Sequence, residues 1–399
     1  MKEAILVLNA GSSSIKFAAY TVTATSADEC LYEGTATGLD ESCARFKFND
    51  RRTARQTEYE VAAADHGQAL QVILDWSVQE ATDLDFVAVG HRVVHGGSLF
   101  RQPVRVDEAV LAQLKTLVPL APLHQPHALL AIEALMSQRP ELQQVACFDT
   151  AFHASMPWQE QHFALPRELF QQGVRRYGFH GLSYEYIARI LPQHLGEVAQ
   201  GKVVVAHLGH GASMCALTNL QSVATTMSFT PLDGLPMGTR SGAIDPAVVL
   251  YLLASGMSAD DISDLLHHRS GLLGLSGRSA DMRALLASDV DAARKAVDYF
   301  CYKAVRELGS LAAALGGLDA LVFTGGIGEH AAPVRQKICQ AAAWLGIDLD
   351  NQANQQDALH ISQEGGRVSV WVVPTDEEQI IGWHTRAMIS APHGHAERS

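Results

Sequence analysis

The chain has 399 residues, of which 47% are hydrophobic and 18% charged, the composition of a well-packed globular protein rather than a disordered one. Because this length is large for one hydrophobic core, we expect two domains. The 43 acidic and 30 basic residues give a net charge of −13, which opposes binding to nucleic acid or to an anionic membrane surface.

The six cysteines are scattered, and none forms a Cys-x-x-Cys pair. This distribution favours reduced thiols over a disulfide framework or a zinc site. The first apolar run, residues 4–8, is too short for a signal sequence, and no run approaches the length of a membrane span. We therefore expect a cytoplasmic protein.

Two similar hairpins are predicted, one in each half of the chain. Residues 4–8 (AILVL) read as a strand that ends in a polar turn at residues 9–14 (NAGSSS) and resumes at residues 15–20. The same order recurs with a strand at 203–206, a turn at 207–213 (HLGHGAS) and a strand at 214–217. Two such hairpins predict a duplicated domain with a cleft between the copies.

Further buried strands and helices alternate along the chain, which predicts an α/β fold. The strands are expected at residues 86–89, 144–148, 318–323 and 368–373. The helices are expected at residues 127–136, 246–253, 293–315 and 377–389.

Three glycine-rich segments follow predicted strands, at residues 9–14, 207–211 and 324–329 (TGGIGE). Backbone N–H groups and hydroxyls in such a turn can bind phosphate without a large basic patch. The first of these, at residues 9–14, lacks Gly-x-x-x-x-Gly-Lys and is followed by a predicted strand, so it is not a P-loop. The segment at residues 9–14 taken alone is also compatible with an ordinary hairpin, but three such segments together favour a phosphate site.

Six segments resemble the signature segments of the acetate kinase family, and the resemblance covers nearly the whole chain. They are residues 9–16 (NAGSSSIK), 90–97 (GHRVVHGG), 148–153 (FDTAFH), 175–181 (RRYGFHG), 237–242 (MGTRSG) and 374–378 (PTDEE). The resemblance implies the fold of the sugar kinase, Hsp70 and actin superfamily, with two ribonuclease-H-like domains around an ATP cleft. It implies one domain at residues 1–150 plus 378–399 and a second at 151–377. The second domain is expected to carry the nucleotide loops and the main contact of a homodimer.

Transfer of a phosphoryl group to a carboxylate requires positive charge more than a general base, because the acceptor is already an anion at pH 7. Arginine suits this task, since its guanidinium stays charged and matches carboxylate and phosphate oxygens. Arg92 and Arg240 resemble the family's acceptor and transition-state arginines. By the same resemblance, His180 stabilises the transition state, His124 is a second active-site histidine, and Asp149 is the catalytic aspartate.

The resemblance also implies the metal and nucleotide residues. Asn9 and Glu377 match metal-associated positions for Mg²⁺, with Mn²⁺ as an alternative, although Glu377 also suits a plain helix start. For ATP or ADP the resemblance points to Lys16, His207, Leu208, Gly209, His210, Gly211, Asp281, Met282, Arg283, Gly326, Ile327, Gly328, Glu329 and His330. Familiar members of the family carry asparagine at the positions of His210 and His330, which leaves the choice between ATP and GTP open.

The acyl pocket implied by the family is lined by Val94, Leu123, Phe179 and Pro231. Such a pocket distinguishes one methylene by only about 1–3 kcal/mol, so acetate and propionate both remain candidate substrates. A different class of function on the same fold is an ATP-switched binding protein like Hsp70 or actin. The acceptor residues Arg92, Arg240, His180 and Asp149 favour the kinase.

Overall fold

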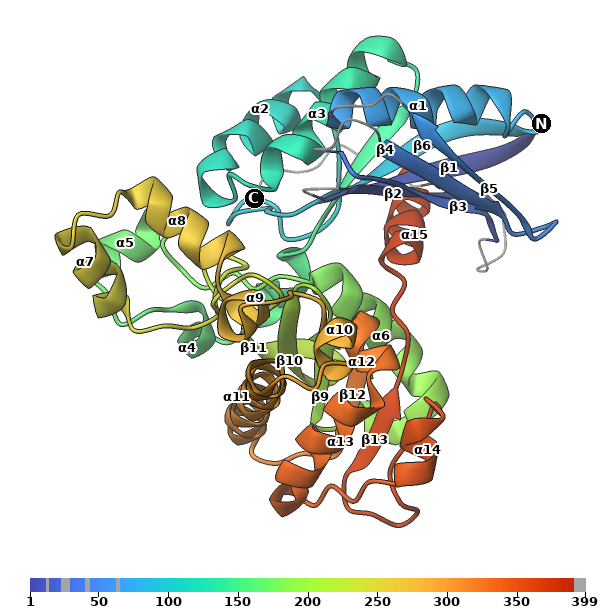
Figure 1. The fold of residues 1–399 in the computed structure, drawn as a ribbon. Helices are drawn as coiled ribbons and strands as arrows, with labels where there is room; N and C mark the ends of the chain where they lie inside the picture. Colours follow the sequence, from blue (N-terminus) through green and yellow to red (C-terminus); the bar gives the residue numbers. More distant parts are fainter. Residues whose placement is uncertain (12–13, 23–28, 40–43, 62–64, 391–399) are drawn as a thin grey trace. The chain divides into compact units, whose positions relative to one another are not determined.

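The computed structural model describes residues 1–11, 14–22, 29–39, 44–61 and 65–390 (Figure 1). Cys43 and two residues of the first predicted turn, Ser12 and Ser13, lie outside the described residues. The chain divides into two compact units, Met1–Ala151 with Asp376–Ser399 and Phe152–Thr375.

The first unit contains an eight-stranded sheet in the order β5-β4-β3-β2-β1-β6-β8-β7. Neighbouring strands from β1 to β5 are antiparallel, whereas β6 pairs parallel with β1 and β8 pairs parallel with β6. The strands are β1 (Lys2–Ala10), β2 (Ser14–Thr21), β3 (Cys30–Thr37), β4 (Ala44–Asp50), β5 (Arg55–Val61), β6 (Leu84–Val93), β7 (Val104–Arg105) and β8 (Gln143–Phe148).

Helices cover both faces of this sheet because its central strands are apolar on both sides. In β1, Ala4, Leu6 and Leu8 belong to a core cluster that also includes residues of α1 (His66–Gln79) and α3 (Gln125–Gln138). Helix α15 (Glu377–Ser390) packs against β1, β6 and β8 and lies on the other side of the sheet in Figure 1. Helix α2 (Glu108–Thr116) packs beside α3.

Gly90 explains how closely α15 approaches β6. A Cβ atom at this glycine would lie 2.2 Å from Thr385 Oγ1 and 2.7 Å from Ile381 Cγ2. Any side chain there would push α15 away from the sheet. The glycine therefore allows α15 to lie close against β6. The first turn of α15 carries Glu377 and Glu378.

The second unit contains a five-stranded sheet in the order β11-β10-β9-β12-β13. Strands β9, β10 and β11 are antiparallel neighbours, while β12 pairs parallel with β9 and β13 with β12. The first unit contains the same arrangement in β3-β2-β1-β6-β8, so the predicted duplication of a ribonuclease-H-like domain is confirmed. The strands are β9 (Val203–Leu208), β10 (Ala212–Thr218), β11 (Gln221–Thr225), β12 (Ala320–Thr324) and β13 (Ser369–Val372).

Two long helices flank this second sheet. Helix α6 (Gly181–Leu195) shares a core cluster with Val203, Val205, Cys215 and Leu217, and α11 (Asp291–Leu315) packs against β9, β10 and β11. Figure 1 shows α6 and α11 on opposite sides of these strands. The remaining helices of the unit are α4 (Trp158–Gln161), α5 (Arg167–Gln171), α7 (Pro246–Ala254), α8 (Ala259–His268), α9 (Gly271–Ser276), α10 (Met282–Leu286), α12 (Gly325–His330), α13 (Ala332–Ala341) and α14 (Asn351–Gln355).

Each strand and helix expected from the sequence overlaps an element of the expected kind. The α/β prediction is therefore confirmed, and the boundaries differ by a few residues at the ends of most strands. Cys30, Cys147, Cys215, Cys301 and Cys339 are free thiols, as expected. None of the helices within the described residues is long and apolar enough to cross a membrane.

Candidate functional site

Arg92 and Asp149 form a buried ion pair at the ends of two neighbouring parallel strands of the first unit. Arg92 lies in β6, and Asp149 directly follows β8. Arg92 Nε and Nη2 both donate to the carboxylate, with the shortest distance, 2.6 Å, between Nη2 and Oδ2. Arg92 Nη1 also donates to Asn9 Oδ1 at 3.2 Å. The guanidinium is therefore held on two sides.

The charges of this pair follow from burial and from mutual attraction. Burial lowers the pKa of Arg92, but the carboxylates of Asp149 and Glu377 outweigh it and raise the pKa overall, so the guanidinium stays charged. Burial raises the pKa of Asp149, and Arg92 opposes that increase. Among the described residues, three of the five N–H groups of Arg92 donate in this network, which leaves one on each terminal nitrogen for an anionic ligand.

Asn9 connects this pair to the two glutamates at the start of α15. Its amide nitrogen donates to Glu378 Oε1 at 2.7 Å and to Glu377 Oε2 at 3.2 Å. The structure therefore brings together the two predicted metal residues, Asn9 and Glu377, which are separated by most of the chain. Lys16, paired with Asn9 across the β1–β2 hairpin, lies near Glu378, whose pKa is raised by burial while the charge of Lys16 opposes that increase. Lys16 thus belongs to this first-unit cluster.

The acidic side of this cluster fits a hard divalent cation. Burial raises the pKa of Glu378, and Glu377 raises it further, so the two carboxylates repel each other in a poorly solvated place. No group of three or more His, Cys, Asp or Glu residues within the described residues is arranged to hold a metal ion. Mg²⁺ suits such an incomplete set, because proteins usually hold it by one or two carboxylates with water and phosphate oxygens completing its shell.

The remaining predicted residues of the first unit lie in two segments that are linked by Gln125. The Gln125 side chain accepts from the backbone N–H of His95 at 3.1 Å and donates to its carbonyl at 3.0 Å. These bonds tie the segment of Leu123 and His124, just before α3, to the segment that follows β6. Val94 in that second segment is buried, whereas Leu123 is exposed. The structure therefore connects the segments of Val94, Leu123 and His124.

His180 is the centre of the second unit's predicted site. It precedes α6 with a left-handed backbone (φ +57°), an unusual conformation for a residue with a side chain. Its ring stacks on that of His207 at 4.3 Å, and its Nδ1 hydrogen-bonds Ser213 Oγ at 2.8 Å. A Cβ atom at Gly211 would lie 3.2 Å from His180 Nε2 and 3.7 Å from Arg240 Nη1. His180 and Arg240 therefore both approach the turn that follows β9.

Arg240 and the residues of the predicted acyl pocket are fixed by short contacts. Arg240 Nη1 donates to the carbonyl of Pro231 at 3.1 Å. Phe179 is buried, and its carbonyl accepts a hydrogen bond at 2.9 Å from Nε2 of His153. Burial lowers the pKa of His153 to about 4, so this histidine is neutral near pH 7. Phe179 and Pro231 thus lie in the second unit, and Val94 and Leu123 lie in the first.

A cavity of about 570 Å³ lies within the second unit, and eight of the predicted nucleotide residues line it. This volume is in the range of small-molecule sites. A Cβ atom at Gly326 would meet no atom within 4 Å, so this glycine leaves the cavity open. The eight are Gly209, His210, Asp281, Met282, Arg283, Gly326, Ile327 and His330, and the other lining residues are Ser279, Ala280, Leu286 and Ala331.

The other predicted nucleotide residues of this unit lie outside that lining. His207 hydrogen-bonds Ser183, and Leu208 is buried in β9. Gly211 forms the turn, where its carbonyl accepts from the N–H of Gly209 at 3.0 Å. Gly328 is buried in α12. The Glu329 carboxylate accepts from the N–H of Gly325 at 2.8 Å, and so it satisfies the first backbone N–H of its own helix, α12.

His210 and His330 differ in their surroundings. Burial lowers the pKa of His210, Arg240 lowers it further, and Asp281 opposes the change. His210 therefore lines the cavity as a neutral ring near pH 7. The side chain of His330 is 68% exposed and lies 3.9 Å from Glu329.

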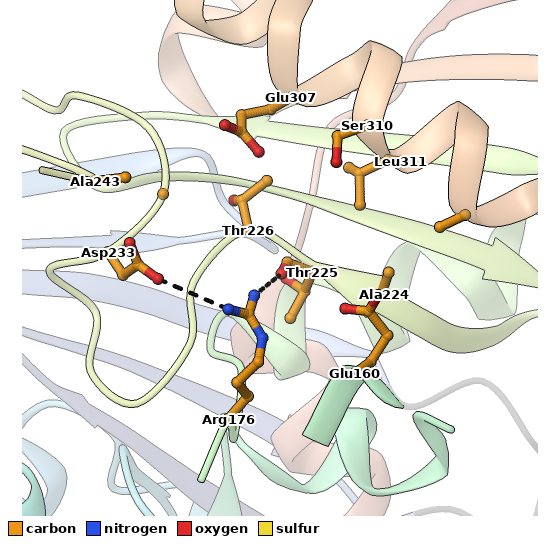
Figure 2. Close-up of a pocket in the computed structure, with 12 residues that line it drawn as sticks. Glu160, Arg176, Ala224, Thr225, Thr226, Asp233, Ala243, Glu307, Ser310 and Leu311 are labelled. Carbon is orange, nitrogen blue, oxygen red and sulfur yellow. Dashed lines mark hydrogen bonds and ion pairs between the residues drawn. The ribbon is translucent and has the colours of Figure 1, made fainter. Parts of the chain in front are cut away.

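A second, smaller cavity of about 210 Å³ lies between β11 and α11 in the same unit (Figure 2). Figure 2 shows Arg176 reaching from its own segment toward Thr225 and Asp233. It donates to the carbonyl of Thr225 at 3.1 Å and lies 4.0 Å from the Asp233 carboxylate. Arg176 thereby ties the segment that leads to His180 to the loop that follows Pro231.

Sequence reasoning missed several residues of these clusters. Glu378 accepts the shorter bond from Asn9, yet the sequence offers only two adjacent glutamates and no way to tell which one turns inward. Ser183 and Ser213 hold the rings of His207 and His180 through single hydroxyls. A lone serine in a helix or strand carries no signal in the sequence that distinguishes it from any other.

Known proteins resemble this chain over nearly its whole length. The sequence model of the Acetokinase family matches residues 4–383. A protein of Rhodopseudomonas palustris (strain TIE-1) named acetate kinase is 55% identical over 389 residues, which cover 96% of this chain and 98% of that protein. An acetate kinase of Methylocella silvestris is 50% identical over 401 residues, covering 98% of both.

Two solved structures share this fold and about a third of the sequence. A propionate kinase from Francisella tularensis has a TM-score of 0.90 at 36% identity, covering 96% of this chain and 99% of its own. The acetate kinase of Porphyromonas gingivalis has a TM-score of 0.86 at 35% identity, covering 97% and 100%.

Each unit contains the same five-strand arrangement. This repeated arrangement and the side chains clustered at the strand ends define a member of the sugar kinase, Hsp70 and actin superfamily. Within it, the chain belongs to the acetokinase family. It is a phosphotransferase that uses ATP and takes a carboxyl group as acceptor.

Proposed function

We propose that the chain is an acetate kinase that transfers the γ-phosphoryl group of ATP reversibly to acetate, with Mg²⁺, to give acetyl phosphate and ADP. The observation that carries this assignment is the charged guanidinium of Arg92, anchored by Asp149 and Asn9, with one N–H on each terminal nitrogen not used by any described residue and so left for an anion. The many relatives named acetate kinase, at up to 55% identity, support acetate as the acceptor.

In this proposal the arginines make up for the repulsion between two anions. Acetate is ionised at pH 7 and needs no base, so Arg92 binds its carboxylate or the transferring phosphoryl group. Asp149 does not take a proton from the acceptor; it orients Arg92. Arg240 and the N–H of His180 stabilise the charge on the equatorial oxygens of the phosphoryl group. His124 assists at the acceptor end.

Asn9 and Glu377, with Glu378 beside them, are the residues we assign to Mg²⁺, and Mn²⁺ suits the same oxygens. When bound, the ion supplies positive charge to the nucleotide phosphates. Asn9 Oδ1 already accepts from Arg92, so the carboxylates are the better ligands and Asn9 positions them. The nucleotide occupies the 570 Å³ cavity of the second unit, and Gly209–Gly211 contact its phosphates. Lys16 is the nucleotide residue that we assign in the first unit.

Propionate is the second candidate acceptor, favoured by the propionate kinase of Francisella tularensis with its TM-score of 0.90. We assign Val94, Leu123, Phe179 and Pro231 to the acyl group of either acid. One methylene changes binding by only about 1–3 kcal/mol, so both acids should react at different rates.

We further propose a homodimer joined through the second unit. Helix α7 is apolar, and none of its residues is buried: Leu250 is 67% exposed and Tyr251 70% exposed. Exposed apolar surface of this extent typically marks a contact with another protein. The buried free thiols support a reducing compartment such as the cytoplasm.

The test is to incubate the protein with ATP, Mg²⁺ and one of acetate, propionate or butyrate, and to trap acyl phosphate with hydroxylamine. We expect the hydroxamate to form fastest with acetate, more slowly with propionate, and only when Mg²⁺ or Mn²⁺ is present. Faster reaction with propionate would reassign the substrate. Acid-independent ATP hydrolysis without any hydroxamate would contradict the kinase assignment.

A further inference from the structure

Two buried hydroxyl groups lie behind His180 in the second unit. Ser213 in β10 and Tyr184 in α6 are both fully buried. Ser213 Oγ hydrogen-bonds His180 Nδ1 at 2.8 Å and the Tyr184 hydroxyl at 2.5 Å. The tyrosine hydroxyl, the serine hydroxyl and the imidazole thus form a chain of two hydrogen bonds that ends at the histidine ring.

The local structure explains why they meet. Tyr184 lies one helical turn after His180, and its backbone N–H donates to the His180 carbonyl at 3.0 Å. Ser213 points to the same face of its strand as Cys215 and Leu217, the face that packs on α6. Helix and strand therefore present the two hydroxyls to one side of the imidazole.

The direction of the hydrogen bonds follows from the requirement that each buried hydrogen has an acceptor. Burial raises the pKa of Tyr184 well above its usual value, so the phenol keeps its proton. Among the described residues, Ser213 Oγ is the one side-chain hydrogen-bond partner of that phenol, so Tyr184 donates to Ser213. The Ser213 hydroxyl is then turned toward His180, and Nδ1 must accept its hydrogen.

An imidazole that accepts at Nδ1 carries its hydrogen on Nε2 when it is neutral. His180 Nε2 is the ring nitrogen that approaches Gly211, next to Arg240 Nη1. If Nδ1 were the donor, Ser213 Oγ would accept from both His180 and Tyr184, and the buried hydrogen of Ser213 would have no acceptor among these partners. That direction would also leave Nε2 as an acceptor, which repels an anionic phosphoryl group.

We infer that Ser213 and Tyr184 are positioning residues, which fix His180 as the neutral tautomer that donates from Nε2 toward the turn at Gly211. The inference rests on the proposed function for the identity of the group that receives this hydrogen bond. Neither residue touches the reactants. The stacked ring of His207, held by Ser183, fixes the plane of the same imidazole.

The test combines nitrogen NMR with steady-state kinetics. In protein labelled with ¹⁵N-histidine, the signals of His180 are assigned by their loss in His180→Gln, and their chemical shifts report the tautomer. We expect the single Nε2–H form in the wild type and a mixture in Tyr184→Phe and Ser213→Ala. We also expect kcat to fall about tenfold in Tyr184→Phe and about 10–100-fold in Ser213→Ala, with KM for ATP within about twofold of wild type.

Ser155→Ala is the matched control, since the Ser155 hydroxyl donates to the backbone carbonyl of Ser222 and bonds none of His180, Ser213 and Tyr184 among the described residues. It should keep the tautomer and kcat of the wild type. A wild-type His180 with its hydrogen on Nδ1 would overturn the inference without any variant. So would a single Nε2–H tautomer and an unchanged kcat in Tyr184→Phe, which removes one oxygen and keeps the ring that packs in the core. Absence of acyl phosphate in the wild type would instead defeat the proposed function, because the tautomer is measured independently.

Discussion

Asp149 accepts hydrogen bonds from two nitrogen atoms of Arg92, and both side chains belong to one buried network with Asn9. Breaking a buried ion pair from one side leaves an uncompensated charge and typically costs about 3–5 kcal/mol. We therefore expect Asp149→Ala to lower the free energy of unfolding by about 3 kcal/mol and Asp149→Asn by less. Urea denaturation measures this change.

Asp149→Asn also separates an orienting role of Asp149 from proton transfer. If Asp149 only orients Arg92, kcat should fall by roughly 100-fold in Asp149→Asn without a new dependence of kcat on pH between 6 and 9. Arg92→Ala removes the charge itself and should be the more damaging change. A kcat in Asp149→Asn that recovers steeply at high pH would indicate that Asp149 is a base after all.

Arg240→Ala tests the second arginine. Its guanidinium lies beside Gly211 but is not part of the cavity lining, so nucleotide binding should survive its loss. We expect kcat to fall by roughly 100–1,000-fold while Kd for ATP, measured by calorimetry, changes less than about threefold. Weak ATP binding with normal turnover at saturation would move Arg240 to the nucleotide site.

Gly326→Leu tests whether the 570 Å³ cavity holds the nucleotide. A Cβ atom at Gly326 meets no neighbour, and its backbone is not in the left-handed region, so a side chain there fills the cavity without strain. We expect KM for ATP to rise at least about tenfold while thermal stability is kept and KM for acetate changes little. In the control Gly309→Ala, the new Cβ makes an ordinary 3.5 Å contact with Trp344, and ATP kinetics should stay unchanged.

Acid stability should depend on His91, which is fully buried and hydrogen-bonded to Gln144 at 2.8 Å. Burial lowers its pKa from 6.5 to about 4, so below pH 6.5 the unfolded chain binds a proton that the folded chain does not. Stability linked to His91 is therefore complete above pH 6.5 and is lost as the pH falls toward 4, by at most about 1.4 kcal/mol per pH unit.

The difference between wild type and His91→Gln isolates this contribution, because buried carboxyls such as Asp149 change stability in the opposite direction. Urea midpoints from pH 7 to 4.5 should fall less steeply in His91→Gln. Parallel pH profiles for the two proteins would show that His91 does not titrate as its burial implies.

Helix α7 should control the oligomeric state. Tyr251→Glu places a charge on its exposed apolar surface, and light scattering after size exclusion should show a monomer where the wild type is a dimer. Val198→Glu is the matched control, because Val198 is an exposed apolar residue of the same unit outside α7. A dimer that persists in Tyr251→Glu would place the contact elsewhere.

The nucleotide cavity illustrates how far sequence reasoning extends. Glycine-rich segments after strands predicted where the chain could approach a phosphate, although the third of them begins α12 rather than a turn. Family motifs added residues 281–283 and 326–330. Ser279, Ala280 and Leu286 also line the cavity, but nothing in their side chains marks them, because they contribute position rather than chemistry.

The sequence by itself determined the strands, the helices and the duplicated domain, because apolar periodicity and glycine-rich turns are local properties of the chain. It also determined the candidate arginines, histidines and carboxylates, through motifs that each span a few residues. Only the tertiary structure decided that Asn9 joins Arg92 to Glu378 and that Ser213 and Tyr184 direct the hydrogen on His180. Those relationships connect residues that are distant in the chain or on different elements, and hydrogen bonds over about 3 Å depend on how helices and strands pack.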